Sequence, residues 1–191
     1  MASTWPEWMT ESFQIANKPE STNDSSAYYG PYNRLLHHLY GVDGPFEVMP
    51  QYHVPATPQH AIDIVATFTV RFGKHPVLFI EVKPPATFDL KSKREEADHQ
   101  MRKRFNRLHT ELITPRLPGI SAFGTRLAFY EYTDATGVTP RAITPNQKYE
   151  TDVAPVEQWN YDILEAAGID KMRETVEGVN VRSAYLPVLN S

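Results

Sequence analysis

Two short apolar runs on either side of a glycine restrict the fold of this chain more than any other feature. In the runs Ile62–Arg71 and Val77–Lys83, the even-numbered residues are apolar. Successive side chains of a strand point to opposite faces, so each run predicts a strand with one buried face and one mixed face. We therefore expect an antiparallel hairpin that turns near Gly73.

The parity of the two runs also predicts which polar residues lie together. Opposed residues of an antiparallel pair point to the same face, so matching the even faces requires a turn centred on one residue. The three-residue loop Phe72-Gly73-Lys74 provides it, with glycine where φ is positive. A centre at 72 places Asp63 opposite Glu81, and a centre at 73 places it opposite Lys83.

Asp63, Glu81 and Lys83 on one sheet face would form a metal-assisted hydrolytic site. Two carboxylates a few ångströms apart repel each other unless they share a cation, and hard oxygen ligands suit Mg²⁺ or Mn²⁺. The lysine could orient or deprotonate water and hold the charge of a phosphodiester. Pro84-Pro85 cannot continue a central strand, so we expect the cluster at the strand's C-terminal end. The alternative is a solvated ion-pair ladder across two strands.

The segment Lys91–Leu112 predicts an amphipathic helix with a strongly basic surface. Its apolar residues recur at helical spacing, at Ala97, Met101, Phe105, Leu108 and Leu112. Seven bases and three acids between residues 91 and 107 give this stretch a charge of +4, so within a net charge of -4 the rest of the chain carries -8.

This segregated charge would suit a polyanionic ligand. Gln100, Arg104 and Arg107 form a row on the flank of the helix, and with Lys93 they are the candidate nucleic-acid contacts. The alternative is a solvated helix surface with ion pairs four residues apart.

Asp63, the apolar hairpin, Ile80-Glu81-Val82-Lys83 and a helix with Gln100 resemble the PD-(D/E)XK, or restriction-endonuclease-like, nuclease superfamily. The stretches Glu-Val-Lys-Pro-Pro and Glu-Ala-Asp-His-Gln-Met-Arg also resemble fungal proteins of this type. The resemblance covers roughly residues 28–133. It implies that Asp63, Glu81 and the carbonyl of Val82 bind the metal, that Lys83 serves the attacking water, and that Gln100 belongs to the catalytic set.

The chain departs from the superfamily pattern at two places. Branches with the helix glutamine carry a tyrosine four residues later, where this chain has Arg104. The first helix often offers a glutamate to the metal, whereas the helix expected over Tyr28–Tyr40 has no acid. Glu47 on the next strand would be a substitute.

Composition agrees with one intracellular domain, in the cytoplasm or nucleus. At 191 residues and 41% hydrophobic content a single core is feasible. The chain has no cysteine, which excludes thiol chemistry and disulfides and suits a reducing compartment. No signal peptide or long apolar run predicts secretion or a membrane partner. We expect an N-terminal arm and linker over residues 1–27 and one domain over 28–191.

The expected fold is α/β, with a restriction-endonuclease-like αβββαβ core, a mixed central sheet flanked by helices, and a C-terminal helical addition. The remaining elements are expected as a strand over Phe46–Val54, a strand over Ile120–Tyr132 with Thr139–Thr144 pairing beside it, a helix from Val156 to Ala167 closed by Gly168, and a shorter helix through Met172 and Val176.

We expect a nuclease that uses Mg²⁺ or Mn²⁺ to hydrolyse phosphodiester bonds in DNA or RNA. The first alternative is an inactive nuclease-like fold that binds nucleic acid or protein, and a purely structural protein is the second. A homodimer is compatible with the expected activity, because cutting both strands of a duplex often needs two sites, but no segment predicts one.

Overall fold

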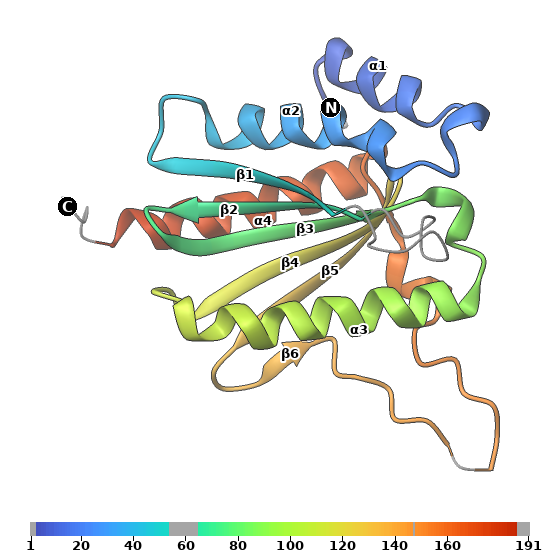
Figure 1. Cartoon of the computed structure of the whole chain (residues 1–191). Helices are drawn as coiled ribbons and strands as arrows, with labels where there is room; N and C mark the ends of the chain where they lie inside the picture. The colour runs from blue at the N-terminus through green and yellow to red at the C-terminus, as the bar shows by residue number, and fades with distance from the viewer. Residues whose placement is uncertain (1–2, 54–64, 147, 187–191) are drawn as a thin grey trace.

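The computed structural model describes residues 3–53, 65–146 and 148–186. Its helices and strands follow the chain in the order α1 (Glu7–Ala16), α2 (Tyr29–Tyr40), β1 (Phe46–His53), β2 (Val65–Phe72), β3 (His75–Lys83), α3 (Lys91–Leu108), β4 (Arg116–Phe123), β5 (Arg126–Thr133), β6 (Gly137–Thr139), β7 (Tyr161–Asp162) and α4 (Ala166–Ala184), with short 3₁₀ turns between several of them (Figure 1).

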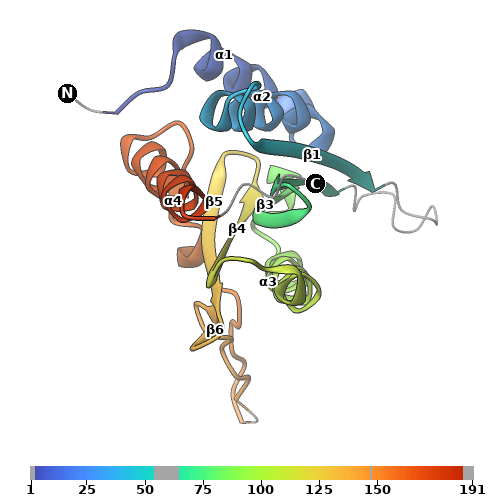
Figure 2. The same cartoon turned by 90° about the vertical axis from the view of Figure 1, so that its left-hand side faces the viewer.

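One open sheet lies at the centre, with strand order β1-β2-β3-β4-β5-β6 and β7 paired to β5. The β3–β4 pair is parallel and the other pairs are antiparallel. Figure 2 shows α3 and α4 on opposite sides of the sheet. The expected α/β class with a mixed sheet flanked by helices is confirmed. Of the helices in the described ranges, none combines the length and apolarity needed to cross a bilayer.

The sheet face toward α1, α2 and α4 is apolar. On β2 and β3 its even-numbered residues, such as Phe68, Ile80 and Val82, are fully buried in one core with side chains from all three helices. Trp5 joins this core and donates from its indole Nε1 to the carbonyl of Ile163 at 2.7 Å. The segment before α2 is therefore fixed to the body, while the predicted domain boundary at residue 28 remains a prediction.

The opposite sheet face packs against α3. The predicted apolar stripe of this helix is confirmed, since Ala97, Met101 and Phe105 are fully buried and Leu108 packs beside them. The helix ends at Leu108 and a 3₁₀ turn continues to Glu111. On β3 the odd-numbered residues point toward this helix, and they begin with Phe79.

In the β2–β3 hairpin the apolar and polar faces are those predicted, but the strands pair in a different register. The turn holds only Gly73, at φ +59°, and Lys74, because Phe72 pairs with His75. A two-residue turn would set even residues against odd ones. Val77 is an extra residue opposite the Val70–Arg71 step, and this bulge restores the match between the apolar faces. Glu81 consequently lies opposite Thr67, so its predicted pairing with Asp63 is wrong.

Two further elements differ from the expectation. The predicted single strand over Ile120–Tyr132 is wrong, because the chain reverses at Gly124, which has φ +61°, and forms β4 and β5 instead. The predicted helix from Val156 to Ala167 is only a 3₁₀ turn followed by β7.

Gly168 does not end a helix but lies in the first turn of α4. A Cβ there would lie 1.9 Å from the carbonyl oxygen of Asp162, so this glycine permits the close approach of α4 to β7. The predicted role of Gly168 as a helix end is therefore wrong, and this glycine serves the packing of α4 against β7.

Candidate functional site

The site forms where α3 runs antiparallel to β3. Two residues of a strand advance by about 6.7 Å, and four residues of a helix advance by about 6 Å. The two repeats almost match, so Glu81 meets Arg104, and Lys83, two residues later, meets Gln100, four residues earlier. This agreement of spacing brings four of the predicted residues together on one sheet face.

Glu81 is buried and paired with Arg104. The Nε of Arg104 donates to Oε1 of Glu81 at 2.7 Å, and the Glu81 side chain is 4% exposed. The same guanidinium lies 3.4 Å from the hydroxyl of Thr67. The second carboxylate oxygen, Oε2 of Glu81, is buried and accepts no hydrogen bond from the described part of the chain. This oxygen is a buried anionic acceptor for a further cation or donor.

Lys83 is the last residue of β3 and is 6% exposed. Its ammonium donates to Oε1 of Gln100, and Nε2 of Gln100 donates to Oε1 of Glu96 at 3.0 Å. The other oxygen of Glu96 accepts from Lys93 at 3.0 Å. This chain of hydrogen bonds runs along α3 from the buried lysine to the partly exposed side chains of Glu96 and Lys93.

Gly119 of β4 lets α3 lie this close to the sheet. A Cβ at this position would be 2.6 Å from Cζ of Phe79 and 2.7 Å from Cζ of Phe105. Both rings lie against the same strand, with centroids 4.8 Å apart. The backbone of β4 thus sets the height of the helix above Glu81 and Lys83.

The other predicted metal ligands do not join Glu81 in the described part of the site. Asp63 lies outside the described residues. Val82, predicted to act through its carbonyl, buries its side chain in the opposite, apolar core. Glu47 pairs with Arg71, whereas Gln51 pairs with Thr67 in the row of Glu81. Four residues of strand span about 13 Å, so Glu47 does not substitute for a ligand at Glu81.

The basic residues of α3 are largely neutralised by neighbours. Its three acids each pair with a base of the same helix, in the pairs Lys91–Glu95, Lys93–Glu96 and Arg102–Asp98. Arg94 is buried and binds Asp152, and Arg104 turns inward to Glu81. Arg107 and Lys103 are exposed. Of the basic residues predicted to contact nucleic acid, Lys93 and Arg104 are held in ion pairs, and Arg107 is the one that presents its charge outward.

Two residues of the cluster were not predicted. Thr67 lies on the polar face that the parity of the run defines, directly opposite Glu81. Glu96 precedes Gln100 by one helical turn and receives its amide. Both follow from spacing, one from strand alternation and the other from the four-residue helical neighbour.

Within the described ranges no three His, Cys, Asp or Glu side chains gather as a metal-binding group. Comparisons with protein-family models, with curated proteins and with solved structures found no match to this chain.

Proposed function

We propose that this protein is a divalent-metal-dependent phosphodiesterase that acts on nucleic acid, with a restriction-endonuclease-like core. The observation that carries the proposal is Glu81, a buried carboxylate with one oxygen lacking a partner among the described residues, beside the buried Lys83 at the end of β3. Burying charges is unfavourable unless they are well paired. Such a cluster is therefore more typical of a catalytic or binding site than of residues that stabilise the fold.

The donor set fits Mg²⁺ or Mn²⁺. Oε2 of Glu81 would be one ligand, and Asp63 and the carbonyl of Val82 would be the others, as the resemblance implies. A bound ion of this kind would acidify water and stabilise charge on the phosphodiester.

The remaining residues would position the reacting groups. Lys83, oriented by Gln100, would hold the attacking water or the charge that develops on the phosphoryl oxygens. Arg104 would hold Glu81 in place and share its charge until the substrate binds. Arg107, one turn further along the exposed part of α3, would contact the backbone of the polymer.

A second candidate function is binding without turnover, and the Glu81–Arg104 pair favours it. Arg104 stands where branches with this glutamine have a tyrosine, and it already supplies Glu81 with a cation. Glu81 and Lys83 are also almost fully buried. In such a protein Arg104 replaces the metal, and the fold serves as an interaction module.

A cleavage assay with matched variants tests the proposal. Plasmid DNA, single-stranded DNA and RNA are incubated with Mg²⁺ or Mn²⁺, using the parent and the variants Asp63→Asn, Glu81→Gln and Lys83→Met. Cleavage by the parent, lowered about 100-fold or more in each variant, supports the nuclease. Glu95→Gln and Lys103→Gln alter charges on the outer part of α3 and should cleave normally.

Two outcomes would contradict the nuclease. If Glu81→Gln or Lys83→Met cleaves as fast as the parent, the site is assigned wrongly. If the parent binds Mn²⁺ or nucleic acid but cleaves none of the three substrates, the binding module replaces the enzyme. Circular dichroism on each variant separates lost chemistry from lost folding.

A further inference from the structure

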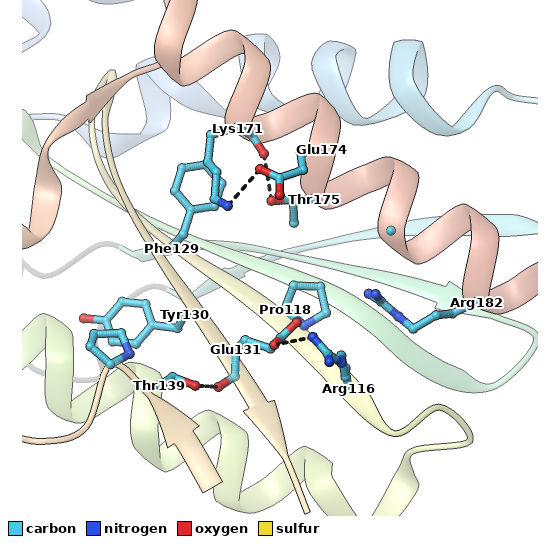
Figure 3. Close-up of a pocket in the computed structure, with 12 residues that line it drawn as sticks. Arg116, Pro118, Phe129, Tyr130, Glu131, Thr139, Lys171, Glu174, Thr175 and Arg182 are labelled. Atoms are coloured by element: carbon cyan, nitrogen blue, oxygen red, sulfur yellow. Dashed lines mark hydrogen bonds and ion pairs between the residues drawn. The ribbon is translucent and has the colours of Figure 1, made fainter. Parts of the chain in front are cut away.

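A cavity of about 640 Å³ lies between α4 and the strands β4 and β5, on the side of the sheet away from α3 (Figure 3). Arg116 and Pro118 of β4 and Phe129 and Glu131 of β5 form one wall, and α4 forms the other. The candidate site contributes no residue to it. The cavity is therefore a separate place in the fold from the proposed nuclease site.

The cavity has an excess of positive charge at one end. Arg116 donates to Glu131 at 3.1 Å, while Lys171 and Glu174 pair at 2.9 Å. Arg182 is the remaining cation, and no acidic group in the described part of the chain lies within ion-pair distance of it. The two ion pairs cancel, so the lining has a net charge of +1 that belongs to Arg182.

The structure gives Arg182 room to reach into the cavity. Figure 3 shows its side chain extending from α4 toward the strands. The guanidinium lies over Gly178, one turn earlier, where a Cβ would be 3.1 Å from Nη1. A glycine inside a helix costs about 1 kcal/mol relative to alanine. Here it leaves space for the arginine.

Arg182 is half-buried, and its surroundings disfavour its positive charge. Burial lowers the pKa of its guanidinium; Glu131 opposes that shift and Arg116 adds to it. Two guanidinium groups therefore act on the same region, and Glu131, which is paired with Arg116, is the carboxylate that acts on Arg182. A second oxyanion would relieve this repulsion through the planar donor groups of arginine.

The neighbouring wall is apolar. Pro118 is buried, and the ring of Phe129 is partly buried. A concave site with an apolar wall and a few converging polar groups is the usual form of a small-molecule site. Its size would admit a molecule larger than an inorganic ion.

We propose that this cavity binds a small organic oxyanion, with its phosphate or carboxylate between Arg116 and Arg182 and its apolar or aromatic body against Pro118 and Phe129.

Calorimetric titration of the whole chain, without divalent metal, tests the site with three probes: inorganic phosphate, phenyl phosphate and benzoate. We expect saturable binding of phenyl phosphate or benzoate, tighter than that of inorganic phosphate because of the apolar wall. Tighter binding of phenyl phosphate than of benzoate would identify the oxyanion as a phosphate, and the reverse order would identify it as a carboxylate. Arg182→Gln and Arg116→Gln should each weaken binding about tenfold, since hydrogen bonds to charged groups contribute this much or more.

Two further variants separate this site from general attraction of anions. Lys103→Gln removes an exposed cation from α3 and should leave binding unchanged. Gly178→Ala keeps every charge but pushes Nη1 of Arg182 outward, so binding should weaken severalfold while the helix remains intact.

The proposal is overturned if none of the probes saturates, or if the two arginine variants bind as well as the parent. Equal weakening by Lys103→Gln would also overturn it, because the anion would then respond to net charge alone. None of these three results bears on cleavage, which the variants of Glu81 and Lys83 test separately.

Discussion

The two faces of the central sheet are built on different principles. Toward α1, α2 and α4, the buried strand residues are apolar, from Ala66 and Phe68 to Leu127. Toward α3, the same strands bury Thr67, Glu81 and Ser121 as well as the terminal Lys83. All buried polar strand residues within the described ranges lie on the α3 face. Hydrophobic burial alone can explain the first face, whereas the second combines a smaller aromatic core with groups that are costly to desolvate.

This contrast teaches where stability and chemistry reside in the fold. Replacing a buried ion pair by apolar residues is often neutral or stabilising, so a gain in stability does not by itself account for Glu81 and Arg104. Their presence beside Lys83 and Gln100 therefore calls for another explanation, which the proposed function provides.

The largest loss of stability should come from a substitution on the apolar face. Phe68 is fully buried, with ring centroids 5.4 Å from Tyr29 and 6.3 Å from Tyr32. Phe68→Ala should lower the free energy of unfolding by about 3 to 5 kcal/mol. Thr67→Val, the adjacent change on the α3 face, should lower it by no more than about 1 kcal/mol. Urea unfolding measures both, and equal losses would erase the distinction between the faces.

A smaller effect is expected from breaking the ion pair of the α3 face. Arg104→Met leaves Glu81 buried without its donor and should destabilise by about 2 to 3 kcal/mol. Adding Glu81→Gln should recover most of that loss, because the uncompensated charge is gone. If the first proposal holds, Mn²⁺ should also stabilise Arg104→Met more than the parent in thermal unfolding. A double variant no more stable than Arg104→Met would show that the two residues do not act as a pair.

The smallest effect concerns alkaline pH. Burial raises the pKa of Tyr28 to about 12 and also raises the pKa values of Tyr32, Tyr40 and Tyr130. The unfolded tyrosines ionise near pH 10, so their contribution to stability is complete below pH 10. It is lost as the pH rises, over pH 10 to 12 for Tyr28.

Tyr28→Phe should therefore make the fall in stability above pH 10 less steep, by less than about 1 kcal/mol per pH unit because solvent screens part of the shift. Unfolding in urea at pH 9, 10 and 11 measures the slope. Three of these four tyrosines belong to the apolar face, and Tyr130 belongs to the α3 face. A slope unchanged by Tyr28→Phe would show that its hydroxyl is not sealed from water.

The fold was predictable where one period dominates the sequence. The alternation of β2 and β3 and the stripe of Ala97, Met101 and Phe105 on α3 gave correct elements and faces. Prediction failed where a glycine admits two interpretations. Gly124 breaks an apolar run that reads as one strand, and Gly168 reads as a helix end although it serves the contact with Asp162. The sequence around Gly168 gives no sign that Asp162 will pack against it.

The sequence predicted that Glu81, Lys83, Gln100 and Arg104 would lie close together, but not which of them would pair. Strand parity placed Glu81 and Lys83 on one face, and helical spacing placed Gln100 and Arg104 on one flank. The inward turn of Arg104 depends on the distance between α3 and β3, which the contact of Gly119 with two phenyl rings sets. The bulge at Val77 similarly determines that Thr67 opposes Glu81. Both are tertiary features without a local signal.

The hairpin between β2 and β3 has a consequence for how this protein can change in length. The short turn and Val77 together keep the apolar faces of the two strands aligned. Deleting one residue from the turn, or deleting Val77, would turn the side chains of part of one strand to the opposite face of the sheet. Phe68 would then turn toward α3, and Thr67 would enter the hydrocarbon interior. Insertions and deletions here should be tolerated only in steps of two residues, or as a compensated pair, even though the turn itself is exposed to solvent.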